Sequence, residues 1–184
     1  ELYKYRVWIA VLMVLVIMLV NLRGVKESGI TFAIPTYFFL IMMYVMIITG
    51  LVKLAMGTLG VVEMAPQDLV NSQQVIQPIT AFLILKAFAS GTTAVTGVEA
   101  ISDGITAFKE PRSKNAGTTL IIMAFILGSM MLAITFLANH AGGLPSEEET
   151  LISQLARTVF GNRGVLYIGA ITATTIILVM AANT

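Results

Sequence analysis

The chain has 184 residues, of which 57% are hydrophobic and 11% charged, with a formal net charge of +1 and a mean hydropathy of +0.90. These values lie far from those of soluble domains and predict a polytopic integral membrane protein, whose main partner is the lipid bilayer. No basic patch with interleaved aromatic residues indicates a nucleic-acid partner. One histidine and no cysteine offer neither a zinc motif nor a thiol nucleophile, so we expect a protein that is not an enzyme and holds no cofactor.

Five segments are apolar over lengths that suit membrane-spanning helices, which need about 20 residues each. They predict an all-α fold and one transmembrane domain over residues 1–184. The predicted spans are 2–22, 30–52, 79–108, 116–139 and 164–184. Because the sequence begins without Met and ends inside the fifth span, we expect it to be a piece of a longer polypeptide, and no signal peptide is recognisable.

The third predicted span contains Glu99, although a charged side chain at mid-bilayer costs about 2.5–3.5 kcal/mol. Weak helix formers surround this glutamate: Ser90, Gly91, Thr92, Thr93, Thr96 and Gly97. We therefore expect the helix to be interrupted over 92–98, with freed carbonyls around Thr96 and Gly97. Broken helices at this depth are tolerated where they line a protein cavity, so the pattern predicts a substrate site.

Other polar residues in the spans leave alternatives open. Asp103 lies four residues after Glu99, and it either pairs with Lys109 or Arg112 or belongs to a proton pathway. Lys86 either reaches the headgroups with its long side chain or acts as an ion gate. Three threonines offer a second ion site, although such hydroxyls also bond back to their own helix: Thr172, Thr174 and Thr175.

A short amphipathic helix is predicted over 146–160, between the fourth and fifth spans. Ser146 and Glu149 match a capping box, and Gly161 is expected to close the helix. The helix is too short to span the bilayer, so it lies on the membrane surface or plugs a vestibule. Three members of its apolar stripe are expected to face the protein: Leu151, Leu155 and Val159.

The distribution of basic residues orients the chain weakly. The predicted turn at 21–29 and the loop at 109–115 together hold five basic residues, and the segments on the other side also hold five. Because the first five lie in short loops close to helix ends, we place these two loops in the cytoplasm.

Several segments resemble the amino acid-polyamine-organocation (APC) superfamily. Its sixth helix and following loop are similar to Thr96-Gly97-Val98-Glu99-Ala100-Ile101-Ser102 and to 109–116, and its loop after helix four is similar to 21–25. With 156–161 included, the resemblance covers nearly the whole chain. The chain is similar in particular to the KimA-type potassium importers. It implies a permease domain that is a fragment of a LeuT-like fold with 5+5 inverted repeats, comprising helices four to eight, in a bacterial inner (plasma) membrane.

The resemblance also implies a function. Amino acid permeases of the superfamily usually carry an aromatic residue beside the helix-six break, whereas this chain has Val95-Thr96-Gly97-Val98-Glu99. A hydroxyl and a carboxylate three residues apart offer hard oxygen ligands to a small cation. The KimA-type family implies potassium binding at Thr96 and Glu99, with Gly97 and Val98 beside them.

We accordingly expect proton-coupled potassium uptake by alternating access. The alternatives are an amino acid permease of the same superfamily and, from another class, a non-transporting membrane sensor or assembly subunit. A structural reading of Glu99, in which its carboxylate pairs with a basic or hydroxyl partner, also stays open. A homodimer is among the assemblies left open.

Overall fold

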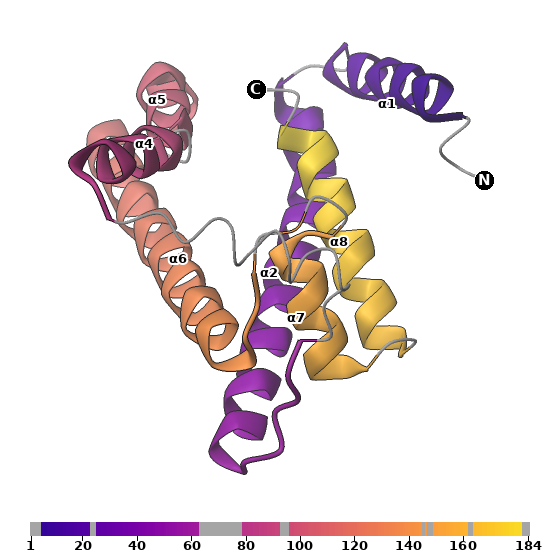
Figure 1. Cartoon of the computed structure of the whole chain (residues 1–184). Coiled ribbons are helices and arrows are strands. Elements are labelled where there is room, and N and C mark those ends of the chain that lie inside the picture. Colours follow the sequence, from indigo (N-terminus) through magenta and orange to yellow (C-terminus); the bar gives the residue numbers. More distant parts are fainter. Residues whose placement is uncertain are drawn as a thin grey trace. The chain divides into compact units, whose positions relative to one another are not determined.

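The computed structural model describes residues 5–22, 25–62, 79–92, 96–144, 146, 149–161 and 164–181, and every regular element in these ranges is helical (Figure 1). The elements are α1 (Arg6–Asn21), α2 (Val25–Ala55), α4 (Ala81–Thr92), α5 (Thr96–Asp103), the 3-10 helix η3 (Gly104–Ala107), α6 (Arg112–Ala141), α7 (Leu151–Phe160) and α8 (Val165–Ala181). The chain divides into two units, residues 1–63 with 134–184 and residues 64–133, and each is described by itself. The all-α prediction is confirmed for the described residues.

Within the described ranges, two helices are long and apolar enough to cross a membrane. They are Phe32–Ala55, with 24 residues within α2, and Arg112–Ala141, with 30 residues. A 24-residue helix measures about 36 Å at 1.5 Å per residue, against a hydrocarbon thickness of about 30 Å. Shorter apolar helices are Val7–Leu19, Ala81–Thr92 and Val165–Ala181.

Both long helices extend beyond the apolar segments that predicted them. Helix α2 begins at Val25, so the turn predicted over 21–29 is wrong from that residue onward. Helix α6 begins at Arg112, within the loop predicted over 109–115. Apolar composition marks the part of a helix that meets hydrocarbon, and the hydrogen-bonded ladder continues into polar residues that lie in water or headgroups.

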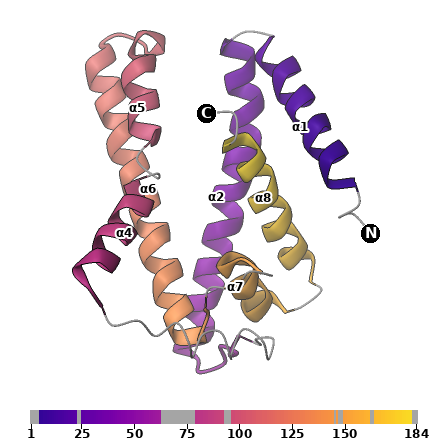
Figure 2. The ribbon, with the colours of Figure 1, turned by 45° about the horizontal axis from the view of Figure 1, so that its top comes forward.

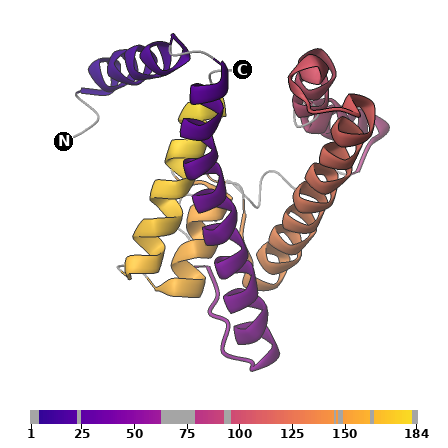
Figure 3. The ribbon, with the colours of Figure 1, turned by 180° about the vertical axis from the view of Figure 1, so that it is seen from behind.

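In the first unit, α2 packs along α8 and α7 (Figures 1 and 3). On α2, three methionines are buried: Met42, Met43 and Met46. Helix α8 packs against α2, and its small residues Ala170 and Ala173 are also buried. A Cβ added at Gly169 would lie 3.0 Å from Cε of Met42, so the glycine permits the close approach of the two helices. Small residues at helix contacts are typical of membrane helix packing.

The chain reverses after α2 and returns to the end of α6. Gly57 has φ +68°, a conformation that glycine adopts without strain, and the amide of Thr58 donates to the carbonyl of Lys53 at 2.8 Å. The amide of Val62 then donates to the carbonyl of Ala141 at 2.8 Å. This bond fixes the segment 58–62 beside the last turn of α6.

The amphipathic helix α7 begins at Leu151, not at Ser146 as the capping-box pattern predicted. Its N-cap is Thr150, whose Oγ1 accepts a hydrogen bond from the amide of Ser153 at 3.3 Å. Glu149, expected inside the helix, precedes it and binds Ser153 with its side chain. The other residues that the pattern included, Pro145, Glu147 and Glu148, lie outside the described residues.

The end of α7 and its buried face agree with the prediction. The helix ends at Phe160, followed by Gly161 at φ +84°. Leu155 and Val159 are fully buried and Leu151 is half-buried, so the apolar stripe faces the protein.

Candidate functional site

Helix α5, in the second unit, carries the residues predicted to bind the substrate. Thr96, Gly97, Val98 and Glu99 form its first turn, although the side chains of Thr96 and Val98 lie outside the described part of the structure. Figure 2 shows α5 beside α6. A Cβ added at Gly97 would lie 3.1 Å from Cε of Met123 in α6, so the glycine lets the two helices approach closely at this turn.

The two carboxylates of α5 are both exposed within this chain. Glu99 and Asp103 are four residues apart and so lie on one face of the helix, about 6 Å from each other along its axis. Asp103 makes no side-chain cap hydrogen bond at the start of η3. Arg112, one of the partners expected for Asp103, forms an ion pair with Glu110, whose Oε1 lies 3.2 Å from Nε of Arg112.

The described part of α5 bears on the expectation of freed carbonyls around Thr96 and Gly97. These two residues belong to the helix, where carbonyls accept the amides four residues later, so freed carbonyls would have to come from the residues before Thr96. The first turn of a helix leaves N–H groups without helical partners. The interruption was predicted over 92–98, but Thr92 still belongs to α4 and 96–98 belong to α5. The remaining residues of that prediction, 93–95, lie outside the described residues.

The other predicted polar residues are also placed. In α8, Oγ1 of Thr174 donates to the carbonyl of Ala170 at 2.8 Å, and Oγ1 of Thr175 donates to Ile171 at 2.9 Å. A hydroxyl that donates its hydrogen keeps oxygen lone pairs, so these bonds still permit cation binding. Lys86 is exposed in α4, which leaves both alternatives for it open.

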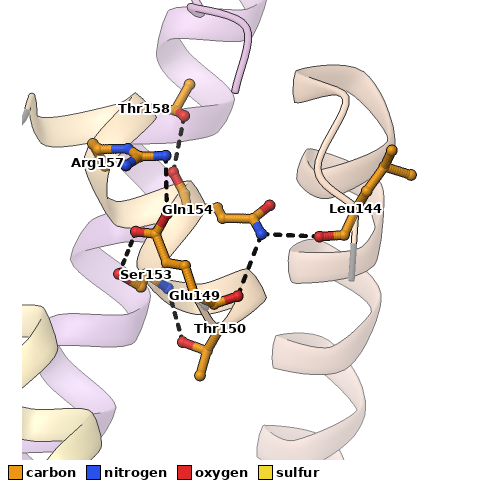
Figure 4. Close-up of polar contacts among 7 residues, drawn as sticks. All are labelled: Leu144, Glu149, Thr150, Ser153, Gln154, Arg157 and Thr158. Atoms are coloured by element: carbon orange, nitrogen blue, oxygen red, sulfur yellow. Dashed lines mark hydrogen bonds and ion pairs between the residues drawn. The ribbon is translucent and has the colours of Figure 1, made fainter. Parts of the chain in front are cut away.

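A cluster of polar residues around the start of α7 was not recognised in the sequence (Figure 4). We call Glu149, Thr150, Ser153, Gln154 and Arg157 the α7 polar cluster. Oε1 of Glu149 accepts from Oγ of Ser153 at 2.7 Å, and its Oε2 lies 2.9 Å from Nη2 of Arg157. The buried Gln154 donates from Nε2 to the carbonyl of Leu144 at 2.9 Å. These bonds fasten the segment after α6 to α7.

The other end of α7 is bound to α2. Nζ of Lys53 donates to the carbonyl of Val159 at 2.7 Å, across 106 residues of sequence. One turn earlier on α2, a Cβ added at Gly50 would lie 2.9 Å from Cδ1 of Leu137 and 3.2 Å from Cγ2 of Val159. No local sequence signal predicts either contact, because each depends on how separate segments pack.

Two comparisons with known proteins bear on this geometry. Residues 3–184 match the family model described as amino acid permease. The chain is also 44% identical over 183 residues to the potassium transporter KimA of Bacillus subtilis (strain 168), an alignment that covers 100% of this chain and 29% of that protein. The chain therefore spans less than a third of the length of this relative.

Proposed function

Because the chain belongs to the amino acid permease family of the APC superfamily, and is therefore a membrane protein of a transporter family, we propose that it forms part of a secondary transporter that takes up potassium. The observation that supports this substrate is the 44% identity to a potassium transporter along the whole chain. In this proposal the helices are the fourth to eighth of a LeuT-like fold that crosses a bacterial inner membrane several times, and uptake is coupled to protons.

Glu99 and Thr96 are the proposed potassium ligands. They lie one helical turn apart at the start of α5. A carboxylate oxygen and a hydroxyl oxygen are hard ligands suited to a group I cation. An interruption between Thr92 and Thr96 would add carbonyls from the last turn of α4, since the last four carbonyls of a helix lack helical partners.

Proton coupling follows from the chemistry of one carboxylate. A bound cation and a proton both neutralise Glu99, so each opposes the binding of the other. Asp103, one turn further along the same face, is the proposed relay for the proton. The hydroxyl oxygens of Thr174 and Thr175 are the proposed ligands of a second ion.

An amino acid permease is the second candidate, because the matching family model carries that description. The residues that would flank such a substrate on helix six are Val95 and Val98, and neither offers the aromatic ring typical of those permeases. Uptake of potassium and uptake of amino acids, measured in the same cells, distinguish the potassium transporter from the amino acid permease. A sensor, the alternative from another class, would bind a ligand without flux.

The test of the ion site is the potassium affinity of the purified full-length transporter at two pH values. In the wild type we expect affinity to fall at the lower pH, because protons compete for Glu99. Glu99→Gln keeps the size and a carbonyl ligand but removes the charge, so we expect weaker binding without pH dependence. Thr96→Val should cost less, about 1–3 kcal/mol for one lost neutral ligand.

Asp103→Asn is the matched control, since it removes an exposed carboxylate from the same face of α5 one turn away. We expect it to leave equilibrium potassium affinity unchanged while slowing proton-coupled uptake. Wild-type affinity and pH dependence in Glu99→Gln would return Glu99 to the structural reading. Growth of a potassium-uptake-deficient strain at limiting potassium, with and without the full-length protein, tests the substrate itself.

A further inference from the structure

Lys53 occupies an unusual position for a charged residue of an apolar helix. It lies in the last turn of α2, its side chain is half-buried, and its ammonium meets a backbone carbonyl rather than a carboxylate. The acceptor belongs to Val159, which is fully buried and lies in the last turn of α7. Carbonyls in the last turn of a helix lack helical partners and carry its negative dipole end, so an ammonium binds them favourably.

Buried apolar residues belong to the helices near this contact. Val159 is fully buried, and so are Leu155, one turn earlier on α7, and Leu137 of α6. Gly50 lies one turn before Lys53 and brings α2 close to Leu137 and Val159. A half-buried ammonium that lost its carbonyl here would leave an unpaired charge beside an apolar contact, which is costly.

Helix α7 is thus bound at both ends by different partners. The α7 polar cluster ties its start to the segment after α6, and Lys53 ties its end to α2. We propose that Lys53 is a positioning residue for transport: its hydrogen bond to Val159 keeps α7 docked on α2, so that the two helices move as one body during the transport cycle. This proposal rests on the proposed function of the chain as part of a transporter.

The experiment uses the full-length transporter with three substitutions. Lys53→Met keeps the apolar stem and removes the ammonium, while Lys53→Arg keeps a charged donor. Lys109→Met is the matched control, because it removes an exposed lysine from a loop. If Lys53→Met does not fold, Lys53→Gln, a shorter neutral donor, takes its place.

Two measurements are made on each variant. Amide hydrogen exchange over 155–161 reports whether α7 stays docked, and it does not depend on which substrate is carried. Initial uptake rates at several potassium concentrations, together with the equilibrium potassium affinity, report whether docking matters to transport.

We expect Lys53→Met to exchange about tenfold faster over 155–161, as the loss of a charge-assisted hydrogen bond predicts. Its maximal uptake rate should fall at least about threefold, while equilibrium potassium affinity stays unchanged, since Lys53 is not a proposed ligand. Lys53→Arg should keep both the exchange rate over 155–161 and the maximal uptake rate close to the wild-type values. Lys109→Met should match the wild type in both.

Wild-type exchange in Lys53→Met would overturn the docking role, and faster exchange with normal uptake would overturn the positioning role. Equal losses in Lys53→Met and Lys53→Arg would assign the effect to packing of the lysine stem and also overturn the proposal. If the wild-type protein carries no potassium, the proposed function fails, while the exchange measurement still decides whether Lys53 holds α7.

Discussion

The ion pair between Glu149 and Arg157 should stabilise the docked start of α7 measurably, which distinguishes it from an ordinary surface pair. Its closest atoms, Oε2 and Nη2, are 2.9 Å apart, and the side chains are 23% and 25% exposed. At an effective dielectric constant of about 20, two unit charges at this distance attract by about 6 kcal/mol. Most of this gain is offset by desolvation and by ordering of the side chains, so we expect a net coupling of about 1–2 kcal/mol.

A double-mutant cycle isolates that coupling. Glu149→Gln keeps an oxygen acceptor for Oγ of Ser153, so it removes charge with little other change. Arg157→Met keeps the apolar stem. The free energy of local opening of α7, from amide hydrogen exchange in the full-length protein, is measured for both single variants and the double variant. The coupling should weaken as salt is added, but only partly, because the pair is mostly shielded from solvent.

The chain supplies its own comparison in Glu110 and Arg112. These two side chains form an ion pair at 3.2 Å, but they are 75% and 50% exposed. The same cycle on this pair should give about 0–1 kcal/mol, with full screening by salt. Equal coupling energies for the two pairs, or a value near zero for Glu149 and Arg157, would refute the argument that partial burial strengthens the α7 pair.

Two further predictions concern packing and the second ion site. Gly50→Ala should destabilise the folded protein by about 1–3 kcal/mol in thermal unfolding, because its Cβ would lie 2.9 Å from Cδ1 of Leu137. Gly128→Ala, with open space at its Cβ, should not destabilise it. Thr174→Val and Thr175→Val should leave the melting temperature nearly unchanged, since each hydroxyl donates to its own helix. Both should weaken the dependence of uptake on the concentration of the second ion. Unaltered ion dependence in both would remove the second site.

The helices of the fold were largely predictable from the sequence, and their ends were not. Hydropathy located each apolar segment, because hydrocarbon selects for composition. It could not show that α2 continues N-terminally to Val25 or that α6 starts at Arg112, because helical hydrogen bonding does not stop where the bilayer does. Predicted span limits and observed helix limits therefore describe different physical boundaries.

The start of α7 shows a second kind of limit. The local capping-box pattern predicted a start at Ser146 with Glu149, whereas the observed N-cap is Thr150. The structure uses Thr150, because the carboxylate of Glu149 binds Arg157 and Ser153 from outside the helix. Side-chain competition of this kind is decided by contacts two turns away, which a capping motif does not include.

The positions of the candidate site residues on one helix were predictable from the sequence, whereas their role as ligands stays a prediction. The spacing of Thr96, Glu99 and Asp103 on one helical face follows directly from the sequence once a helix is assumed. Which carbonyls around Thr96 and Gly97 are free depends on where α5 begins, and the helix already includes both residues. The interruption itself stays a prediction, since it falls between the described parts of α4 and α5.

The charged residues of the described helices differ in how well structure alone accounts for them. Lys53 bonds to a helix end, and Glu149 and Arg157 pair with each other, so stability explains why each charge is present in an apolar chain. Glu99 takes part in neither the Glu149–Arg157 pair nor the Glu110–Arg112 pair, and it is exposed on α5. A charge inside a predicted membrane span is expensive and therefore needs a compensating partner. In the proposed function a transported cation is that partner of Glu99, so Glu99→Gln is the variant that tests the proposal most directly.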